Sequence, residues 1–201
     1  MNYTTLKSSV ADWLNRQDLT SVIPTFISLA EADLNRSVRH RQMLGRATTT
    51  LDSHFTALPT DFLEAKNVQL NTNPLTSLKY VTMEHADLLR RGDATGQPKY
   101  YTIIGDTLEV VPVPSTDYEI ELTYYKQIPA LSDDNLTNWL INSHPDVYLY
   151  GTLMQSAPYL KDDERVGVWG SLYRQFVSDL NLSSDKAESS GSTLVMRTGV
   201  W

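Results

Sequence analysis

The stretch 118–124 reads YEIELTY, and it decides the fold class of this chain. Apolar and polar residues alternate along it, which is typical of a strand with one buried face and one face in water. The same period of two runs from Arg46 to Ile128. It predicts strands at 46–51, 54–58, 65–70, 76–81, 99–105, 107–112 and 118–128. They follow one another too closely for parallel crossovers, which need a dozen or more residues, so we expect largely antiparallel pairing.

Local signals divide this strand-rich region further. Gly105 and Asp106 lie between two apolar runs and predict a tight hairpin, because glycine supplies the positive φ of such a turn. Pro112 and Pro114 cannot donate to a sheet, so their strand must end there or lie at an edge. Residues 83–91 (MEHADLLRR) predict a short helix that Gly92 ends.

The N-terminal part of the chain has the apolar period of a helix. Residues 4–15 place Leu6, Val10, Trp13 and Leu14 on one face. A second helix is expected to begin near Thr20 or Ser21 and to end between His40 and Gly45. It has Pro24 in its first turn, where proline is tolerated. Its apolar stripe is Ile23, Phe26, Ile27, Ala30, Leu34 and Val38, with Glu31, Asn35 and Arg39 on the opposite face.

Helical period returns after a connecting loop at 129–138. Residues 142–146 (NSHPD) predict a helix start, since they combine a cap, a proline and an acid in the first turn. Pro158 is expected to break this helix. A last helix should begin near 161–163 and end near Leu182. Its apolar seam is Val166, Trp169, Tyr173, Phe176, Val177 and Leu180.

These elements predict an α+β fold. Residues 1–45 and 139–182 are expected to form an antiparallel helical bundle, which carries a mostly antiparallel β-rich insertion at 46–128. Residues 183–201 are expected to extend from the bundle as a C-terminal arm. Serine and glycine are frequent in this segment, which does not support a packed core.

The arm ends in apolar residues, which is what a docking segment needs. Its apolar residues are Leu194, Val195, Met196, Val200 and Trp201. A solvated tryptophan gains nothing from its large apolar area, so we favour docking on a partner. The alternative is a frayed chain end.

Composition narrows the class of protein. Of the 201 residues, 41% are hydrophobic and 20% are charged, so the chain is not disordered throughout. No membrane span and no secretory signal are expected, since no run of 18 apolar residues and no basic-then-apolar start occurs. The absence of cysteine excludes disulfides, thiolate metal sites and cysteine nucleophiles. A net charge of −7 makes the chain a poor general binder of nucleic acid.

The sequence predicts no catalytic, metal or cofactor site. Its histidines are interpreted as surface or capping residues, because none has the spacing of a helical metal site; they are His40, His54, His85 and His144. No phosphate-binding, dinucleotide-binding or nucleophile-elbow motif occurs. A carboxylate-based hydrolase of cell-wall glycan stays as an alternative. Its candidate acids, none with a partner visible in the sequence, are Glu64, Glu109, Glu119 and Glu121.

One basic cluster stands out in this acidic chain. It consists of Arg36, Arg39, Arg41 and Arg46. Residues 1–50 carry six basic and four acidic residues, whereas 51–201 carry 11 and 20. Three interpretations stay open: contact with another subunit or partner through bidentate carboxylate pairs, contact with DNA phosphates, or solvated cations at a helix end.

Several stretches resemble one family in their order and number. They are 3–7 (YTTLK), 12–20 (DWLNRQDLT), 23–27 (IPTFI), 30–36 (AEADLNR), 58–64 (LPTDFLE), 98–101 (PKYY), 124–131 (YYKQIPAL), 138–151 (NWLINSHPDVYLYG) and 157–165 (APYLKDDER). Together they resemble the head-to-tail adaptor, or connector, proteins of tailed bacteriophages, and the resemblance covers about residues 1–180.

The resemblance implies a structural protein of the virion and not an enzyme. Such a protein would form a homo-oligomeric ring, normally of twelve copies, beneath the portal protein. It would extend the DNA channel, bind a tail nozzle or tail-tube protein, and reside at the head–tail junction after assembly in the host cytoplasm. Genomic DNA would pass through without sequence-specific binding. The resemblance also assigns portal docking to the apolar residues of the arm.

Overall fold

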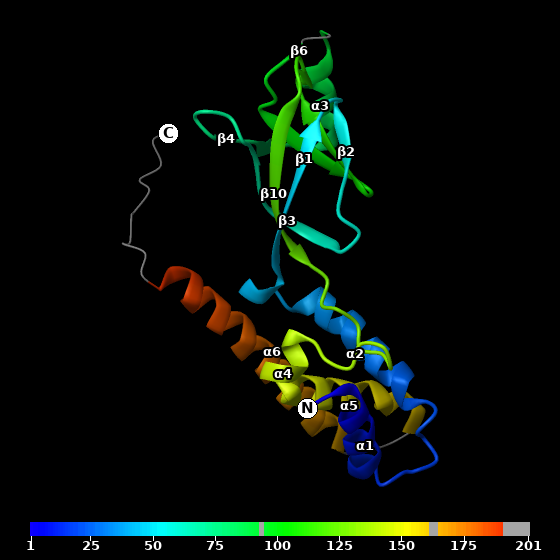
Figure 1. Cartoon of the computed structure of the whole chain (residues 1–201). Coiled ribbons are helices and arrows are strands. Elements are labelled where there is room, and N and C mark those ends of the chain that lie inside the picture. The colour runs from blue at the N-terminus through cyan, green and yellow to red at the C-terminus, as the bar shows by residue number, and fades with distance from the viewer. Residues whose placement is uncertain (93–94, 161–164, 191–201) are drawn as a thin grey trace. The chain divides into compact units, whose positions relative to one another are not determined.

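Six α-helices and mostly antiparallel sheets give the chain an α+β fold over the residues that the computed structural model describes, which are 1–92, 95–160 and 165–190 (Figure 1). The predicted α+β class is thereby confirmed. Two compact units divide the chain. The helical unit comprises Met1–Gln42 and the chain from Ile128 onward, and the strand unit comprises Met43–Gln127.

The helical unit is built around one central helix. Its helices are α1 (Tyr3–Leu14), α2 (Ile23–Ser37), α4 (Trp139–Ser143), α5 (Pro145–Leu160) and α6 (Arg165–Ser189). Helix α5 packs against each of the other four. Its Tyr148 and Leu153 are completely buried, together with Leu6 of α1 and Leu34 of α2. Burial of these apolar faces against α5 stabilises all of the helices at once.

The first two helices follow the predicted periodicity, with three differences. Helix α2 ends at Ser37 and not between His40 and Gly45, because the backbone becomes extended at Val38. Asn2 and Thr5 cap α1 reciprocally, but Trp13 is 45% exposed because it lies at the margin of the apolar stripe. The predicted cap of α2 at Thr20 or Ser21 is wrong. Val22 holds the cap position without a side-chain bond, because the backbone around Leu19 already forms a turn that leads into the helix.

The last two helices are longer than the sequence suggested. Pro158 lies inside α5 and does not break it until Leu160, since a proline so close to the end disturbs only the last turn. Helix α6 continues to Ser189 and does not end near Leu182. Leu180 and Ser184 are both buried on its inner side, so packing extends the helix into the serine-rich segment.

The strand unit contains two four-stranded sheets. One has the order β1-β10-β3-β4 and the other β2-β8-β7-β5, and β6 and β9 form a separate short pair. The strands are β1 (Leu44–Leu51), β2 (Phe55–Ala57), β3 (Phe62–Leu70), β4 (Thr76–Ser77), β5 (Lys79–Tyr80), β6 (Thr95–Gly96), β7 (Tyr100–Ile104), β8 (Thr107–Val111), β9 (Val113–Pro114) and β10 (Tyr118–Lys126). Helix α3 (Met83–Arg90) contacts β7 and β8.

The alternating stretch that predicted the strand region forms β10, which lies between β1 and β3. Its apolar residues Ile120, Leu122 and Tyr124 are buried in the core of the strand unit. Strands β1 and β10 pair antiparallel from Leu44 opposite Tyr125 onward, so the two chain segments at the start and end of this unit are hydrogen-bonded to each other.

The predicted hairpin is confirmed between β7 and β8, where Gly105 has a φ of 57°. Two parallel contacts were not predicted. β5 pairs with β7, and β6 pairs with β9, over two residues each. Pairs of two residues have no signature in the sequence. The strands β5 and β6 meet β7 and β9 only because the surrounding fold places them side by side.

Candidate interaction surfaces

The basic cluster begins at the end of α2, where two arginines have different surroundings. Arg36 is 70% exposed at its side chain and forms an ion pair with Asp33 at 3.2 Å. Arg39 turns back onto α2, because its guanidinium donates to the carbonyls of Asn35 at 2.9 Å and Val38 at 2.8 Å. A cation that binds the last carbonyls of a helix satisfies its dipole. The Arg39 side chain therefore stabilises the end of α2, independently of any contact with a partner.

The other two arginines lie in separate units. The Arg41 side chain is exposed and forms no ion pair within the described part of the chain, although its backbone N–H donates to Ser184 Oγ at 2.9 Å. Arg46 lies on β1 of the strand unit, 77% exposed, with its Nε 3.8 Å from Glu121. Three of the four arginines thus keep guanidinium groups at the surface.

Buried polar side chains hold the loop before α4 against α2. Glu31 is only 7% exposed, and its Oε1 accepts from the Leu131 N–H at 2.7 Å and from the Tyr148 hydroxyl at 3.2 Å. Asn35, one turn later, accepts from the Ile128 N–H at 2.9 Å. Burial raises the pKa of the Glu31 carboxyl, against the two hydrogen bonds, which act in the opposite direction. The expectation that Glu31 lies on the face opposite the apolar stripe of α2 was wrong.

A second part of this network positions α4. Asn138 caps α4 by accepting from the Ile141 N–H, and its side-chain amide donates to the Pro129 carbonyl and to the Tyr148 hydroxyl. Burial and the neighbouring Glu31 raise the pKa of Tyr148 far above its ordinary value, so its hydroxyl stays protonated. The loop, α2, α4 and α5 are therefore joined through one chain of hydrogen bonds.

One histidine is buried, contrary to the expectation of surface or capping residues. His40 is 6% exposed and stacks on Trp139, with ring centroids 5.2 Å apart. Its Nδ1 accepts from the Gln42 N–H at 3.2 Å, and the His144 ring lies 6.4 Å away. Burial lowers the pKa of His40, and the charges of His144 and Arg41 lower it further. No group of three or more possible metal ligands occurs among the described residues.

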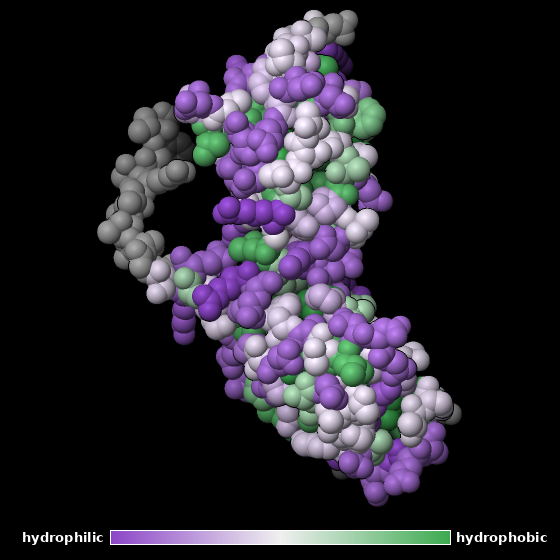
Figure 2. Space-filling view, in the orientation of Figure 1, coloured by the Kyte–Doolittle hydropathy of each residue, from purple (hydrophilic) through white to green (hydrophobic). Residues whose placement is uncertain are grey.

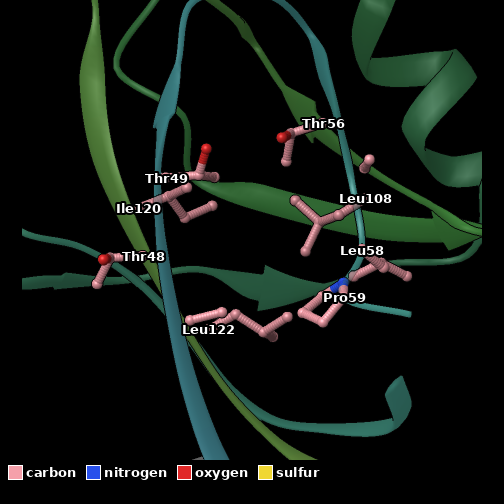
Figure 3. A pocket seen from close by; sticks show the side chains of 10 residues that line it. Thr48, Thr49, Thr56, Leu58, Pro59, Leu108, Ile120 and Leu122 are labelled. Carbon is pink, nitrogen blue, oxygen red and sulfur yellow. The ribbon is translucent and has the colours of Figure 1, made fainter. Parts of the chain in front are cut away.

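One hollow of the strand unit is lined mainly by apolar groups. It has a volume of about 240 Å³ and opens between β1 and β2 (Figure 3). Its walls are Ala47, Thr48, Thr49, Thr56, Ala57, Leu58, Pro59, Leu108, Ile120 and Leu122. No acid is among these residues, so the hollow can take an apolar group but offers no general acid or base.

The glutamates of the hydrolase alternative are spread over the strand unit. Glu109 forms an ion pair with Arg90, and Glu119 and Glu121 lie along β10, the first exposed and the second near Arg46. Glu64 lies in β3 and lines a more open hollow with Phe62 and Tyr101. The structure does not bring them together around the cavity.

The remaining surface is mostly polar. On the face in Figure 2, hydrophilic side chains cover most of both units and hydrophobic residues form small separate spots. Over the described residues, the helices are too short or too polar to cross a bilayer. The five apolar arm residues, Leu194, Val195, Met196, Val200 and Trp201, lie outside the described residues.

Comparison with known protein families gives a match over almost the whole chain. The sequence model of a family described as the SU10 adaptor protein matches residues 1–197, which is almost the whole chain. No curated protein matches the chain.

Proposed function

Because the chain belongs to the SU10 adaptor protein family, a family of phage head–tail adaptors, we propose that it assembles as a ring of twelve copies beneath the portal. The ring extends the DNA channel and provides the attachment site of the tail. Membership in the family carries this proposal, since the family implies association with portal and tail components at the head–tail junction of the virion. In each copy of the proposed ring, the helices of the helical unit form an antiparallel bundle.

The charge of the chain supports a ring that surrounds DNA without binding it tightly. The helical unit holds 10 basic and 13 acidic residues, and the strand unit holds 7 and 11. Both units are therefore net negative, and a ring of either one gives the channel an acidic wall. An acidic wall repels phosphate, so DNA slides past it by the same electrostatics that make basic surfaces bind DNA.

The same charge opposes assembly of the free protein. Twelve copies at −7 each repel one another, so ring closure requires the portal as a template. We expect light scattering to find a monomer for the pure protein and rings only after portal is added. A stable ring without portal at low salt, where repulsion is least screened, would contradict templating. If the protein does not bind portal at all, the proposed adaptor function itself is wrong.

The exposed arginines supply contacts between subunits or with a partner. Arg36, Arg41 and Arg46 present guanidinium groups that can each hold a carboxylate of a neighbouring acidic surface. Arg39 is included in this contact region, although its side chain also binds the end of α2. Arg41→Ala should weaken ring formation on the portal and leave the folded monomer unchanged. Arg91→Ala, which removes one exposed arginine outside the cluster, is the matched control.

The apolar arm carries the contact with the portal. Its apolar residues are Leu194, Val195, Met196, Val200 and Trp201. Because α6 continues to Ser189, the informative truncation removes residues 190–201 and not 183–201. The truncated chain should keep its helical content by circular dichroism and lose binding to portal in a sedimentation assay. Full binding by the truncated chain would refute the docking role.

A further inference from the structure

One side of helix α6 keeps apolar residues at the surface. Val168, Leu172 and Phe176 follow one another at intervals of four residues, so they form one stripe along the helix, the α6 stripe. Val168 is 60% exposed, and the other two residues are partly buried. Phe176 contacts Tyr150 of α5, which in turn contacts the exposed Trp13 of α1. The apolar surface thus continues across three helices, which is typical of an interaction site.

An acid lies at the end of the α6 stripe. Asp179 comes seven residues after Leu172, which is almost two helical turns, so both side chains lie on the same side of α6. The Asp179 side chain is exposed and forms no ion pair within the described part of the chain. A partner that covers the stripe therefore needs a basic group about 10.5 Å from its first apolar residue, at 1.5 Å of helix per residue.

Helix α2 presents this pattern on its own outer side. Leu29 is 48% exposed, Ala32 is exposed, and Arg36 is 70% exposed at its side chain. Their spacing of three and four residues makes them a second stripe, the α2 stripe, in which Leu29 and Arg36 are also seven residues apart. Laid side by side in the same direction, the two stripes bring apolar to apolar, small to large and basic to acidic. The facing pairs are Leu29 with Leu172, Ala32 with Phe176, and Arg36 with Asp179.

The two stripes of one chain do not meet each other. Helices α2 and α6 both pack against α5 (Figure 1). Where α6 does reach α2, the Tyr173 hydroxyl donates to Asp33 at 2.7 Å and the Asn181 amide donates to the Ser37 carbonyl at 3.0 Å. Tyr173 and Asn181 lie about 100° and about 180° around the helix from Leu172. The α6 stripe is therefore turned away from the α2 helix of its own chain.

We propose that the α6 stripe of one copy packs against the α2 stripe of the next copy, with Arg36 bound to Asp179. The inference rests on the proposed ring and names the carboxylate that one of its exposed arginines holds. Each copy carries both stripes on different sides, so a head-to-tail contact satisfies every copy of a closed ring. Arg36 already pairs with Asp33 at 3.2 Å, and the five N–H donors of its guanidinium allow it to hold both acids.

Charge reversal tests the contact. Arg36→Asp and Asp179→Arg each place like charges at every junction of a ring, so each should reduce the yield of rings on the portal at least tenfold. A 1:1 mixture of the two variants should restore the yield to within twofold of the unmodified chain, because alternating copies bring opposite charges together at every junction of a twelve-membered ring. The chain that carries both substitutions should restore it for the same reason.

Two exposed residues of the strand unit provide matched controls. Arg91→Asp and Asp117→Arg make the same charge changes at positions outside both stripes. Each should change the yield of rings less than twofold, and a 1:1 mixture of Arg36→Asp with Asp117→Arg should not rescue assembly. Rescue by this control mixture would mean that net charge, and not the α2–α6 contact, decides the yield.

Disulfide cross-linking measures the proximity of the stripes directly, because the chain has no cysteine of its own. One batch carries Leu29→Cys, a second carries Leu172→Cys, and the two are mixed, assembled on portal and oxidised. We expect a covalent dimer on a non-reducing gel. Ser178→Cys in place of Leu172→Cys should cross-link at least tenfold less, since position 178 is exposed but lies about 120° around the helix from the stripe.

The outcomes separate this inference from the proposed function. Unchanged ring yield of both charge variants, loss without rescue by the mixture, or equal cross-linking from positions 172 and 178 would each overturn the α2–α6 contact. The adaptor function would stand in these cases, because the unmodified chain still forms rings on portal. If the unmodified chain forms no ring, both proposals fail. Circular dichroism of the charge variants should match that of the unmodified chain; if one loses helical content, the cross-link decides.

Discussion

Replacing Glu31 with leucine should destabilise the helical unit by about 2–6 kcal/mol, because two buried hydrogen-bond donors lose their acceptor. The Leu131 N–H and the Tyr148 hydroxyl donate to the same carboxylate oxygen, at 2.7 and 3.2 Å. Each buried donor without a partner costs about 1–3 kcal/mol. The bond from Asn138 is accepted by the Tyr148 oxygen, so it does not replace the acceptor that the Tyr148 O–H loses.

Tryptophan fluorescence during urea unfolding measures this effect in the right part of the molecule. Trp13, Trp139 and Trp169 all belong to the helical unit. The midpoint of the transition should fall for Glu31→Leu at an unchanged slope. Asp12→Leu, an acid-to-leucine change at an exposed position of α1, should stay within about 0.5 kcal/mol of the unmodified protein. A loss below about 1 kcal/mol for Glu31→Leu would refute the reasoning, since the two donors would then have other acceptors.

The pH dependence provides a second arm of the same test. The folded pKa of Glu31 is raised, so between the unfolded and folded pKa values the folded chain binds the extra proton. The stability that the group contributes is therefore present below its unfolded pKa of about 4.3 and is lost as pH rises through the folded pKa. Glu31→Gln does not titrate. The free energy of unfolding of Glu31→Gln should therefore rise relative to that of the unmodified protein as pH increases through this window, and it should not decrease.

Two other predictions concern the helical unit. Gly151→Leu should cost about 1–3 kcal/mol of stability through overpacking, since even a Cβ at this position would lie 3.0 Å from the Tyr173 ring. Gly167→Leu is the control, because a Cβ there meets open space and avoids such a clash. Thermal unfolding compares the stabilities of the two variants. The pKa of His40 is lowered in the folded state, so its contribution to stability is present above about pH 6.5 and is lost as pH falls through the lowered value. His40→Phe keeps a ring on Trp139 without titrating, and urea unfolding from about pH 7.5 to pH 5 should show a smaller loss for it than for the unmodified chain.

Much of the strand unit follows from local pattern. The alternation in 118–124 is a property of neighbouring residues, and it correctly predicts the burial of Ile120, Leu122 and Tyr124. Gly105 could be identified for the same reason, since its turn needs only a glycine between two apolar runs. The end of α6 could not be predicted. Ser184 is an ordinary spacer residue in the sequence, and only the backbone N–H of Arg41, far away in the chain, gives its hydroxyl a buried partner.

The candidate sites were harder to predict than the fold. Glu31 is buried beside the apolar stripe of α2, and nothing local in the sequence shows that the loop at 129–138 covers it. The cavity arises because small side chains such as Ala47 and Thr49 face larger ones across two sheets. Such residues are unremarkable in any strand, so the space they leave is visible only in three dimensions. The arginine cluster, by contrast, is plain in the sequence, but its division between two units is not.

The pairing of Leu44 with Tyr125 brings the two ends of the strand unit together. Residues paired across antiparallel strands lie about 4.5–5.5 Å apart at their Cα atoms, so a linker of a few residues could replace everything between them. Recombination between phage genomes could swap the segment for another of similar spacing, and the helical core would not need to change its sequence. Evolution could therefore alter what the strand unit contacts while the α2–α5 network stays as it is.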